Sequence, residues 1–189
     1  ALEIHSKFGK LSRKQVMQPA YELAQKGFAV YKDLAEAIQE RTPVLKKYPS
    51  SAKIFLKSNG EAFEVGEILK QQDLARTLQK ISQHGERVFY RGEIAKAIAK
   101  ESTKQNGILS LDDLKKYSVK WREPVYGTFE GYEIMSMPPP SSGGTHVVEI
   151  LNILEQDSLK DLGYGSANSV HLEASAMQQA FADRASFMG

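Results

Sequence analysis

The sequence predicts an α+β fold that is mainly α-helical and carries one β-hairpin. Short amphipathic helices with clear end signals fill residues 1–118. From residue 119 the composition changes to β-branched and aromatic residues around a Glu130-Gly131 turn, which is typical of two paired strands. We therefore expect two regions: a helical region over 1–118, and a region over 119–189 with the hairpin, a proline-rich turn and two C-terminal helices.

The first long helix is predicted from its end signals. Ser12 and Gln15 have the three-residue spacing of a capping box, in which each side chain bonds the other's backbone N–H. Pro19 suits a first helical turn, where its missing N–H costs nothing. Gly27 suits the position just past a helix end, where left-handed backbone is common.

The next stretch of sequence has a helical spacing of apolar residues, and it is followed by a segment interrupted by proline and glycine. Leu34 and Ile38 lie four residues apart, which predicts one face of a helix over 31–40. Pro43, Pro49 and Gly60 then predict irregular structure or single helical turns over 42–62.

Three further helices complete the first region. Leucine and isoleucine at helical spacing predict a helix over 71–84 that ends at Gly85. A second is expected over 91–104, closed by Gly107. Ser110 should cap a short helix to about Lys116, whose first turn holds two aspartates that complement the helix dipole.

The second region starts with strands of about 124–129 and 132–137. A two-stranded hairpin is marginal by itself in water, so we expect it to pair with further strands or to pack on helices. A helix over about 145–156 is apolar on more than one side, which predicts burial. Ser166 or Asn168 should cap the last helix, which runs to about Met188.

A turn of seven residues between the hairpin and the apolar helix is the most specific motif. It consists of Pro138, Pro139, Pro140, Ser141, Ser142, Gly143 and Gly144. Backbone N–H groups at a helix start can hold phosphate or carboxylate, but no P-loop or dinucleotide fingerprint is present. The chemistry favours a tight turn in which the glycines allow close packing and the serines cap the helix.

The sequence gives weaker support to other candidate catalytic, substrate-binding and metal-binding residues. Ser141 or Ser142 with nearby His146 suggests a serine hydrolase, but the Gly-x-Ser-x-Gly elbow is absent. The Asp183-Arg184 pair could clamp a substrate, although an ion pair with a neighbouring element is the expected role. The four histidines, His5, His84, His146 and His171, lack the spacing of a helical zinc site.

Composition and charge restrict the kinds of chemistry and of partner that we expect for the chain. The chain has 189 residues and no cysteine, which excludes disulfides and thiolate chemistry. No apolar run is long enough for a membrane span, and no signal peptide is visible. Residues 1–122 hold 23 Lys and Arg against 14 Asp and Glu, whereas residues 123–189 hold 2 against 9. The basic residues are scattered without interleaved aromatics, so no nucleic-acid partner is expected.

An ordered set of segments resembles the large subunit of γ-glutamyltranspeptidases. The turn with the helix after it is specific, and the other segments are weak singly but strong in their shared order. The set comprises residues 5–11, 19–28, 66–78, 85–92, 113–117, 122–125, 138–144 and 180–184. Together they extend over essentially the whole chain.

The resemblance implies an enzyme made as one precursor that cuts itself into two subunits. A threonine at the new N-terminus of the small subunit is the family's nucleophile, with its own amino group as base. The family transfers the γ-glutamyl group of glutathione and similar amides to water or to amino acid and peptide acceptors, without a cofactor. The family fold is an αββα architecture, in which helices cover two central sheets. A periplasmic or extracellular location follows from the resemblance alone.

None of the family's catalytic residues matches a position of this chain. The nucleophile and the oxyanion donors are expected after Gly189, and the arginine that grips the substrate carboxylate before Ala1. Residues 138–144 match a family motif and are assigned a structural role. We therefore expect an inactive interior fragment whose partner is the small subunit. A helical interaction module, or an anion-binding domain that uses residues 141–144, remains the alternative.

Overall fold

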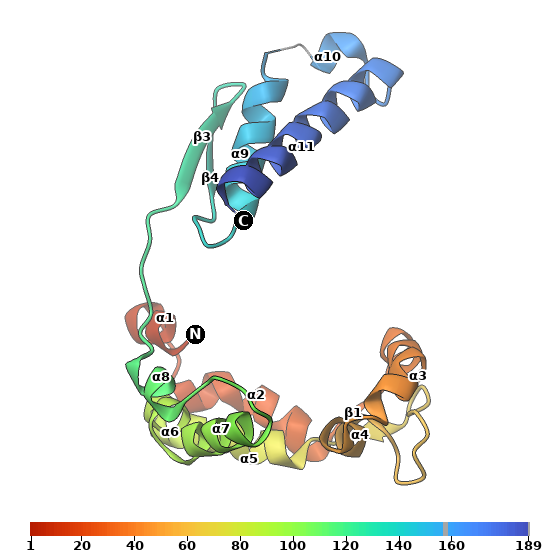
Figure 1. Ribbon diagram of the computed structural model, residues 1–189, viewed down its shortest axis with the longest axis vertical. Helices are drawn as coiled ribbons and strands as arrows, with labels where there is room; N and C mark the ends of the chain where they lie inside the picture. Colours follow the sequence, from red (N-terminus) through yellow and green to blue (C-terminus); the bar gives the residue numbers. More distant parts are fainter. Residues whose placement is uncertain (157–158, 189) are drawn as a thin grey trace. The chain divides into compact units, whose positions relative to one another are not determined.

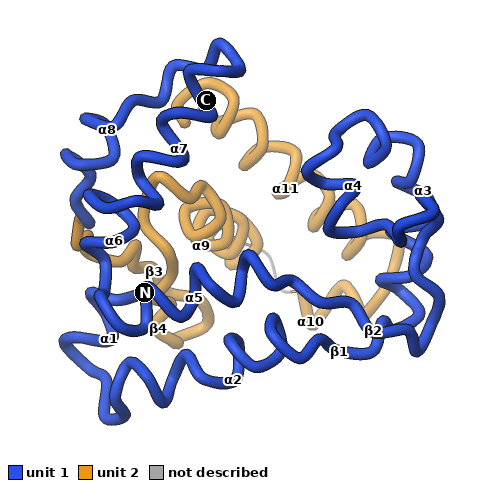
Figure 2. Tube along the Cα trace, turned by 90° about the horizontal axis from the view of Figure 1, so that it is seen from below, with its two compact units in different colours: residues 1–119 blue, residues 120–189 orange. Residues whose placement is uncertain are grey.

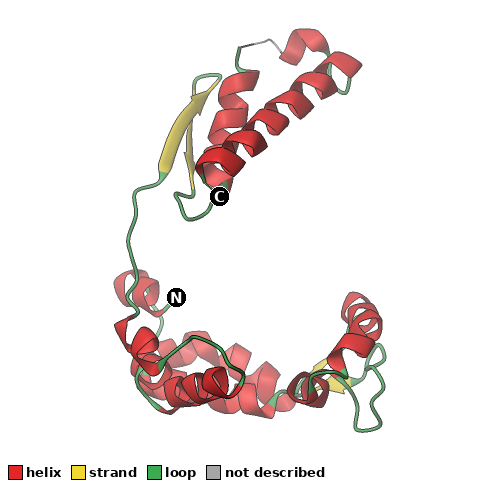
Figure 3. Cartoon of the chain, in the orientation of Figure 1, coloured by secondary structure: helices red, strands yellow, loops and turns green. Residues whose placement is uncertain are grey.

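The computed structural model describes residues 1–156 and 159–188; Gly189, expected at a helix terminus, lies outside the described residues. Helices predominate and the strands are short (Figure 3). The chain forms two compact units, residues 1–119 and 120–189 (Figure 2). The mainly helical α+β prediction is confirmed.

The first unit holds eight helices and one pair of two-residue strands among its residues (Figure 1). The helices are α1 (Leu2–Phe8), α2 (Arg13–Lys26), α3 (Lys32–Leu45), α4 (Pro49–Phe55), α5 (Gln72–His84), α6 (Glu86–Tyr90), α7 (Glu93–Lys104) and α8 (Leu111–Lys116). The strands β1 (Phe28–Ala29) and β2 (Ile68–Leu69) pair antiparallel.

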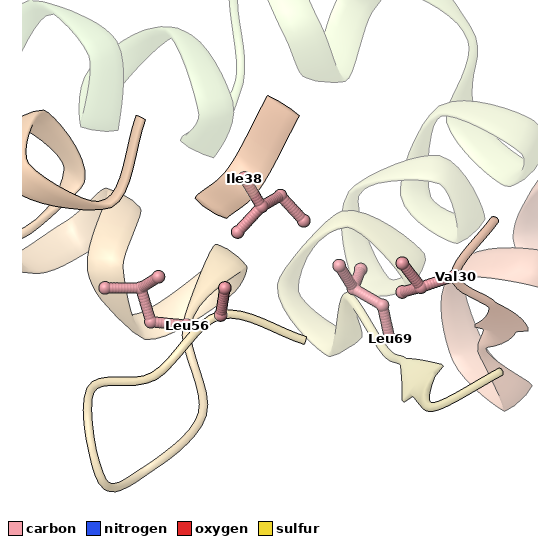
Figure 4. Packing of buried hydrophobic residues seen from close by; sticks show 5 residues of the cluster. Val30, Ile38, Leu56 and Leu69 are labelled. Atoms are coloured by element: carbon pink, nitrogen blue, oxygen red, sulfur yellow. The ribbon is translucent and has the colours of Figure 1, made fainter. Parts of the chain in front are cut away.

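A cluster of buried aliphatic side chains forms the core of this unit (Figure 4). Val30 and Leu69 are its most deeply buried large side chains, and Ile38 and Leu56 complete the contact from α3 and from the end of α4. Leu34 packs against the same cluster, so the predicted face of Leu34 and Ile38 is confirmed. Gly27 lies at φ 87° beside β2, and a Cβ there would collide with the side chain of Ile68.

Helices α2 and α5 pack antiparallel and are joined at both ends. The Arg13 guanidinium donates from Nε to the Ser82 carbonyl at 2.8 Å and from a terminal nitrogen to the Gln83 carbonyl at 3.1 Å. At the opposite end, Gln72 Nε2 donates to the Gln25 carbonyl at 2.7 Å. Arg13 therefore binds the carbonyls of the last turn of α5, which have no partner within the helix.

Several predicted helix ends are confirmed. Ser12 and Gln15 form the capping box of α2, and Gly27 ends that helix. Helix α5 ends at Gly85. Ser110 caps α8, with Asp113 as its capping-box partner. These ends depend on chemistry between near neighbours, which the sequence displays directly.

The role predicted for Pro19 is wrong, because α2 begins at Arg13 and continues through Pro19. Helix α3 likewise continues through Pro43 to Leu45, and α4 spans seven residues, so the irregular structure expected over 42–62 is wrong in part. Leu45 packs against the core cluster. Burial therefore outweighs the hydrogen bond that each proline removes.

Helix α7 ends at Lys104, as predicted, although it begins at Glu93 rather than Arg91. The residue that turns the chain differs, because Asn106 rather than Gly107 takes the left-handed conformation, with φ 56°. The Gly107 N–H then donates to the Ser102 carbonyl at 2.7 Å. Asparagine tolerates this conformation better than most residues do, so the chain turns one residue early.

The second unit consists of the strands β3 (Val125–Phe129) and β4 (Tyr132–Ser136) and the helices α9 (Gly143–Leu154), α10 (Leu159–Leu162) and α11 (Ala167–Phe187). The predicted hairpin is confirmed, and both residues of its turn, Glu130 and Gly131, have positive φ. Helix α9 packs against both the hairpin and α11 (Figure 1). Ser166, not Asn168, caps α11.

Helix α9 is less buried than its composition predicts. Among the described residues of the helix, only Gly144 and Leu154 are buried, and the Val147 side chain is 46% exposed. The hairpin covers one side of the helix: Gly127 of β3 lies so close to Val148 that a Cβ would collide with its side chain. Apolar surface therefore remains on the helix within this unit.

The double hydrogen bond from Arg13 should contribute measurably to the stability of the first unit. We expect Arg13→Ala to lower the free energy of unfolding by about 1–2 kcal/mol, since bonds from a charged donor are stronger than neutral ones but this one is partly exposed. Lys14→Ala, on the exposed side of the same turn, is the matched control. Urea denaturation followed by circular dichroism measures both; equal losses would contradict the assignment.

Candidate functional site

The turn of residues 138–144 joins the end of β4 to the start of α9. Its Pro139–Pro140 peptide is cis. Gly144 is buried, and a Cβ on it would overlap the carbonyl oxygen of Met137 and lie 2.8 Å from the Met137 nitrogen. A Cβ on the neighbouring Gly143 would have Ser141 Oγ as its nearest contact, at 3.5 Å, which is ordinary van der Waals distance. Of these two adjacent glycines, therefore, only Gly144 closely approaches the backbone of Met137.

The expectation that serines cap α9 is wrong. Ser142 precedes the helix but has helical backbone angles, φ −76° and ψ −17°, and makes no side-chain cap bond. A capping side chain normally needs extended backbone to reach the N–H groups ahead of it. Ser141 Oγ instead accepts from the Gly143 N–H at 3.4 Å, which belongs to the turn itself.

The side chain of Ser142 is hydrogen-bonded by a residue of α11 that is distant in sequence. Its Oγ accepts a hydrogen bond from Nε of Arg184 on α11, at 3.2 Å and 42 residues away in sequence. The guanidinium is a permanent proton donor. The guanidinium has no acceptor atom, so Arg184 cannot take the proton of the Ser142 hydroxyl as a general base would.

The neighbouring Asp183 does not form the expected ion pair. No ion pair of Asp183 or Arg184 occurs among residues 1–156 and 159–188. Asp183 Oδ1 instead accepts from Gln179 Nε2 at 3.1 Å. Burial raises the pKa of Glu149, and the hydrogen bond to Asp183 and its charge raise that pKa further.

His146 does not serve as a base for either serine. Its ring lies 5.3 Å from that of Phe181, at an interplanar angle of 41°. The buried Nε2 has no hydrogen-bond partner in the described part of the chain. The sequence places His146 near Ser141 and Ser142, but the helix turns its ring toward α11. A serine–histidine pair is therefore not assembled here.

The first unit contains a separate open cleft of about 980 Å³. Its wall includes Tyr90 and Tyr117, whose rings stack with centroids 4.9 Å apart. Burial raises the pKa of Tyr90, with smaller effects from Tyr117 and Glu86. The charged side chains of its wall are of both signs: Glu3 and Glu86, and Arg87, Arg91 and Lys115.

Within the described residues no group of three or more His, Asp or Glu is placed to hold a metal ion. His5 Nε2 is engaged with the Leu11 carbonyl at 2.8 Å. No described helix combines the length and the apolar character that a bilayer crossing needs.

Around the turn, the described side chains include no hydrogen-bonded pair of a serine and a histidine. Sequence reasoning found the turn but missed the contact that α11 makes with it, between Arg184 and Ser142. Glu149 is the single charged residue among residues 147–154, where Asn152 is the one other polar residue. A carboxyl on such a stretch is expected to find a partner when it is buried.

Comparison with known proteins gives consistent matches along the chain. A family profile described as gamma-glutamyltranspeptidase matches residues 2–189. The glutathione hydrolase proenzyme of Escherichia coli is 41% identical over 184 residues, which cover 97% of this chain and 32% of that protein. An acylase proenzyme from Pseudomonas sp. is 38% identical, with 97% and 33% covered. The chain therefore spans about a third of the length of these curated relatives.

Comparison with solved structures gives matches to the same family of proteins. The crystal structure of Helicobacter pylori gamma-glutamyltranspeptidase superposes with a TM-score of 0.95 at 43% identity, covering 99% of this chain and 54% of that one. The Bacillus anthracis transpeptidase CapD superposes with a TM-score of 0.85 at 35% identity, covering 99% and 64%.

The contact at Gly144 predicts a contrast between two adjacent glycines. Gly144→Ala should destabilise the second unit by about 2 kcal/mol, because overpacking against backbone forces α9 away from β4. Gly143→Ala should be neutral or slightly stabilising, because alanine favours helix and the position is open. Thermal unfolding of both variants tests this; similar behaviour of the pair would rule out the close approach as the cause.

Proposed function

The chain belongs to the γ-glutamyltranspeptidase family, and from this premise we propose that it is an interior part of the large subunit of such an enzyme. The whole protein transfers the γ-glutamyl group of glutathione and related amides to water or to amino acid and peptide acceptors. The nucleophile is a threonine outside this chain, at the N-terminus of the small subunit. Its free amino group acts as the base.

The extent of the family match carries this proposal. The match extends over residues 2–189, yet those residues correspond to only 32% of the Escherichia coli relative. That relative is named a proenzyme, which supports a precursor that is cleaved into subunits. The absence of a nucleophile–base pair around the turn, in the described residues, fits a catalytic centre encoded elsewhere in the precursor.

The role we assign to this chain is to hold the turn and its two helices in place. Gly144 sets the distance between β4 and α9, and Arg184 fastens Ser142 to α11. The partner is the small subunit of the same precursor, and the compartment is the periplasm or the cell exterior. Nothing in the comparisons supports the alternatives of an interaction module or an anion-binding domain.

The proposal is tested on the full-length protein. We expect it to split into two subunits and to release p-nitroaniline from γ-glutamyl-p-nitroanilide. Replacing the threonine at the new N-terminus by alanine should abolish both cleavage and turnover, because one group performs both steps. The 189-residue chain alone should show no turnover. Turnover by that chain alone, or by an uncleaved protein, would refute the proposal.

The size of the effect of Ser142→Ala on kcat distinguishes a structural role of Ser142 from a nucleophilic one. If Ser142 only accepts a bond from Arg184, its loss should cost about 1 kcal/mol of stability and leave kcat within about threefold. Loss of a serine nucleophile lowers kcat by about 10⁴-fold or more. Steady-state kinetics of the full-length variant, together with its unfolding midpoint, distinguishes the two outcomes.

A further inference from the structure

Between α4 and β2, the loop of residues 57–67 is folded around one lysine. Lys57 Nζ lies 3.4 Å from each carboxylate oxygen of Glu67, 3.8 Å from Glu61 Oε2 and 4.0 Å from Glu64 Oε1. The lysine side chain is only 23% exposed, whereas those of the three glutamates are 40% to 83% exposed. One cation that is largely withdrawn from solvent therefore faces three carboxylates.

Backbone hydrogen bonds form a small turn at each end of this loop. The Lys57 N–H donates to the Glu61 carbonyl, and the Gly60 N–H donates to the Lys57 carbonyl, both at 2.8 Å. At the other end, the Glu64 N–H donates to Glu67 Oε2 at 2.6 Å. The contact between Lys57 and Glu67 therefore joins the two turns.

The closed loop also covers part of the core of the first unit. Ala62 is buried and forms an isolated β-bridge with Leu56. Phe63 packs against the same core cluster. The Glu67 carbonyl accepts from the Val30 N–H at 2.9 Å. Opening of the loop would therefore expose apolar side chains that are now covered.

The charges of the loop do not balance. The bond from the Glu64 N–H lowers the pKa of Glu67, Lys57 lowers that pKa further, and burial acts in the opposite direction. With all three glutamates ionised at neutral pH, three carboxylates against one ammonium leave two net negative charges. Lys46 at the end of α3 is exposed, and its Nζ would lie 3.9 Å from a Cβ on Gly60. Within the described residues, however, the ion pairs of these glutamates are all with Lys57.

We propose that the charge of Lys57 holds the loop of residues 57–67 closed on the core cluster, and that the loop opens when salt screens this charge. This device is independent of the proposed catalytic function. Each of the three carboxylates lies within 4.0 Å of the same nitrogen, so they also lie close to one another. Without the lysine charge their mutual repulsion favours the open loop.

The direction of the salt effect distinguishes this role from simple packing of the lysine side chain. The Debye length falls from about 14 Å at 0.05 M to about 4 Å at 0.5 M salt. In the wild type, screening weakens the attraction between Lys57 and the glutamates, and the loop opens more often. In Lys57→Met an apolar side chain of similar length remains beside three like charges. Screening there weakens repulsion, so the loop closes more often.

Amide hydrogen exchange in the full-length protein tests the proposal, with peptides from residues 57–67 measured at neutral pH. At about 0.05 M NaCl we expect Lys57→Met to exchange about fivefold faster than the wild type in this loop. Raising the salt to about 0.5 M should speed exchange of the wild type about twofold and slow that of the variant about twofold. Comparison of the proteins in the same buffer cancels the chemical exchange rate.

Two further variants and an internal reference make the result specific. Lys53→Met removes an equal charge from an exposed position of α4 and should behave as the wild type at both salt concentrations. Lys57→Met with Glu64→Gln should exchange more slowly than Lys57→Met alone, because one of the three like charges is gone. Peptides from α5 report unfolding of the whole unit. A salt effect of the same sign in wild type and Lys57→Met, equal acceleration in Lys53→Met or in α5, or no slowing in the double variant would overturn the proposal.

Discussion

The close approach of α9 to the backbone of Met137 is the constraint on which the second unit depends. A side chain at Gly144 would overlap the Met137 carbonyl, so the helix begins against the end of β4 only because this position is glycine. A second close contact that requires glycine occurs where Gly127 lies against Val148. These two contacts set α9 on the hairpin, and α11 packs on α9 in turn. Polar contacts then fix α11: Arg184 binds Ser142 across 42 residues of sequence.

Much of the fold was predictable because its signals are local. The capping boxes at Ser12 and Ser110 and the Glu130-Gly131 turn each depend on residues within three positions of one another. The paths through Pro19 and Pro43 were not predictable, because packing on α5 and on the core cluster outweighs a local penalty. The two-residue strands β1 and β2 pair residues about 40 apart, and strands so short leave no periodic pattern in a sequence.

In the candidate site, too, the sequence predicted some features and missed others. The sequence identified residues 138–144 as the specific motif and assigned them a structural role, which remains a proposal. It misjudged how the serines act, since capping was expected and Ser142 instead accepts from Arg184. Proximity in sequence also suggested a serine–histidine pair, whereas α9 directs the His146 ring onto Phe181. Side-chain direction is a property of the assembled helices, so chain order alone does not reveal which groups meet.

The polar contact that α11 makes with the turn does not depend on pH in the physiological range. The Arg184–Ser142 bond joins a guanidinium that stays charged to a hydroxyl that stays neutral. Ser142 directly precedes α9, and Arg184 lies in the last turn of α11. This one bond therefore ties the start of α9 to the end of α11, in addition to the packing between the two helices.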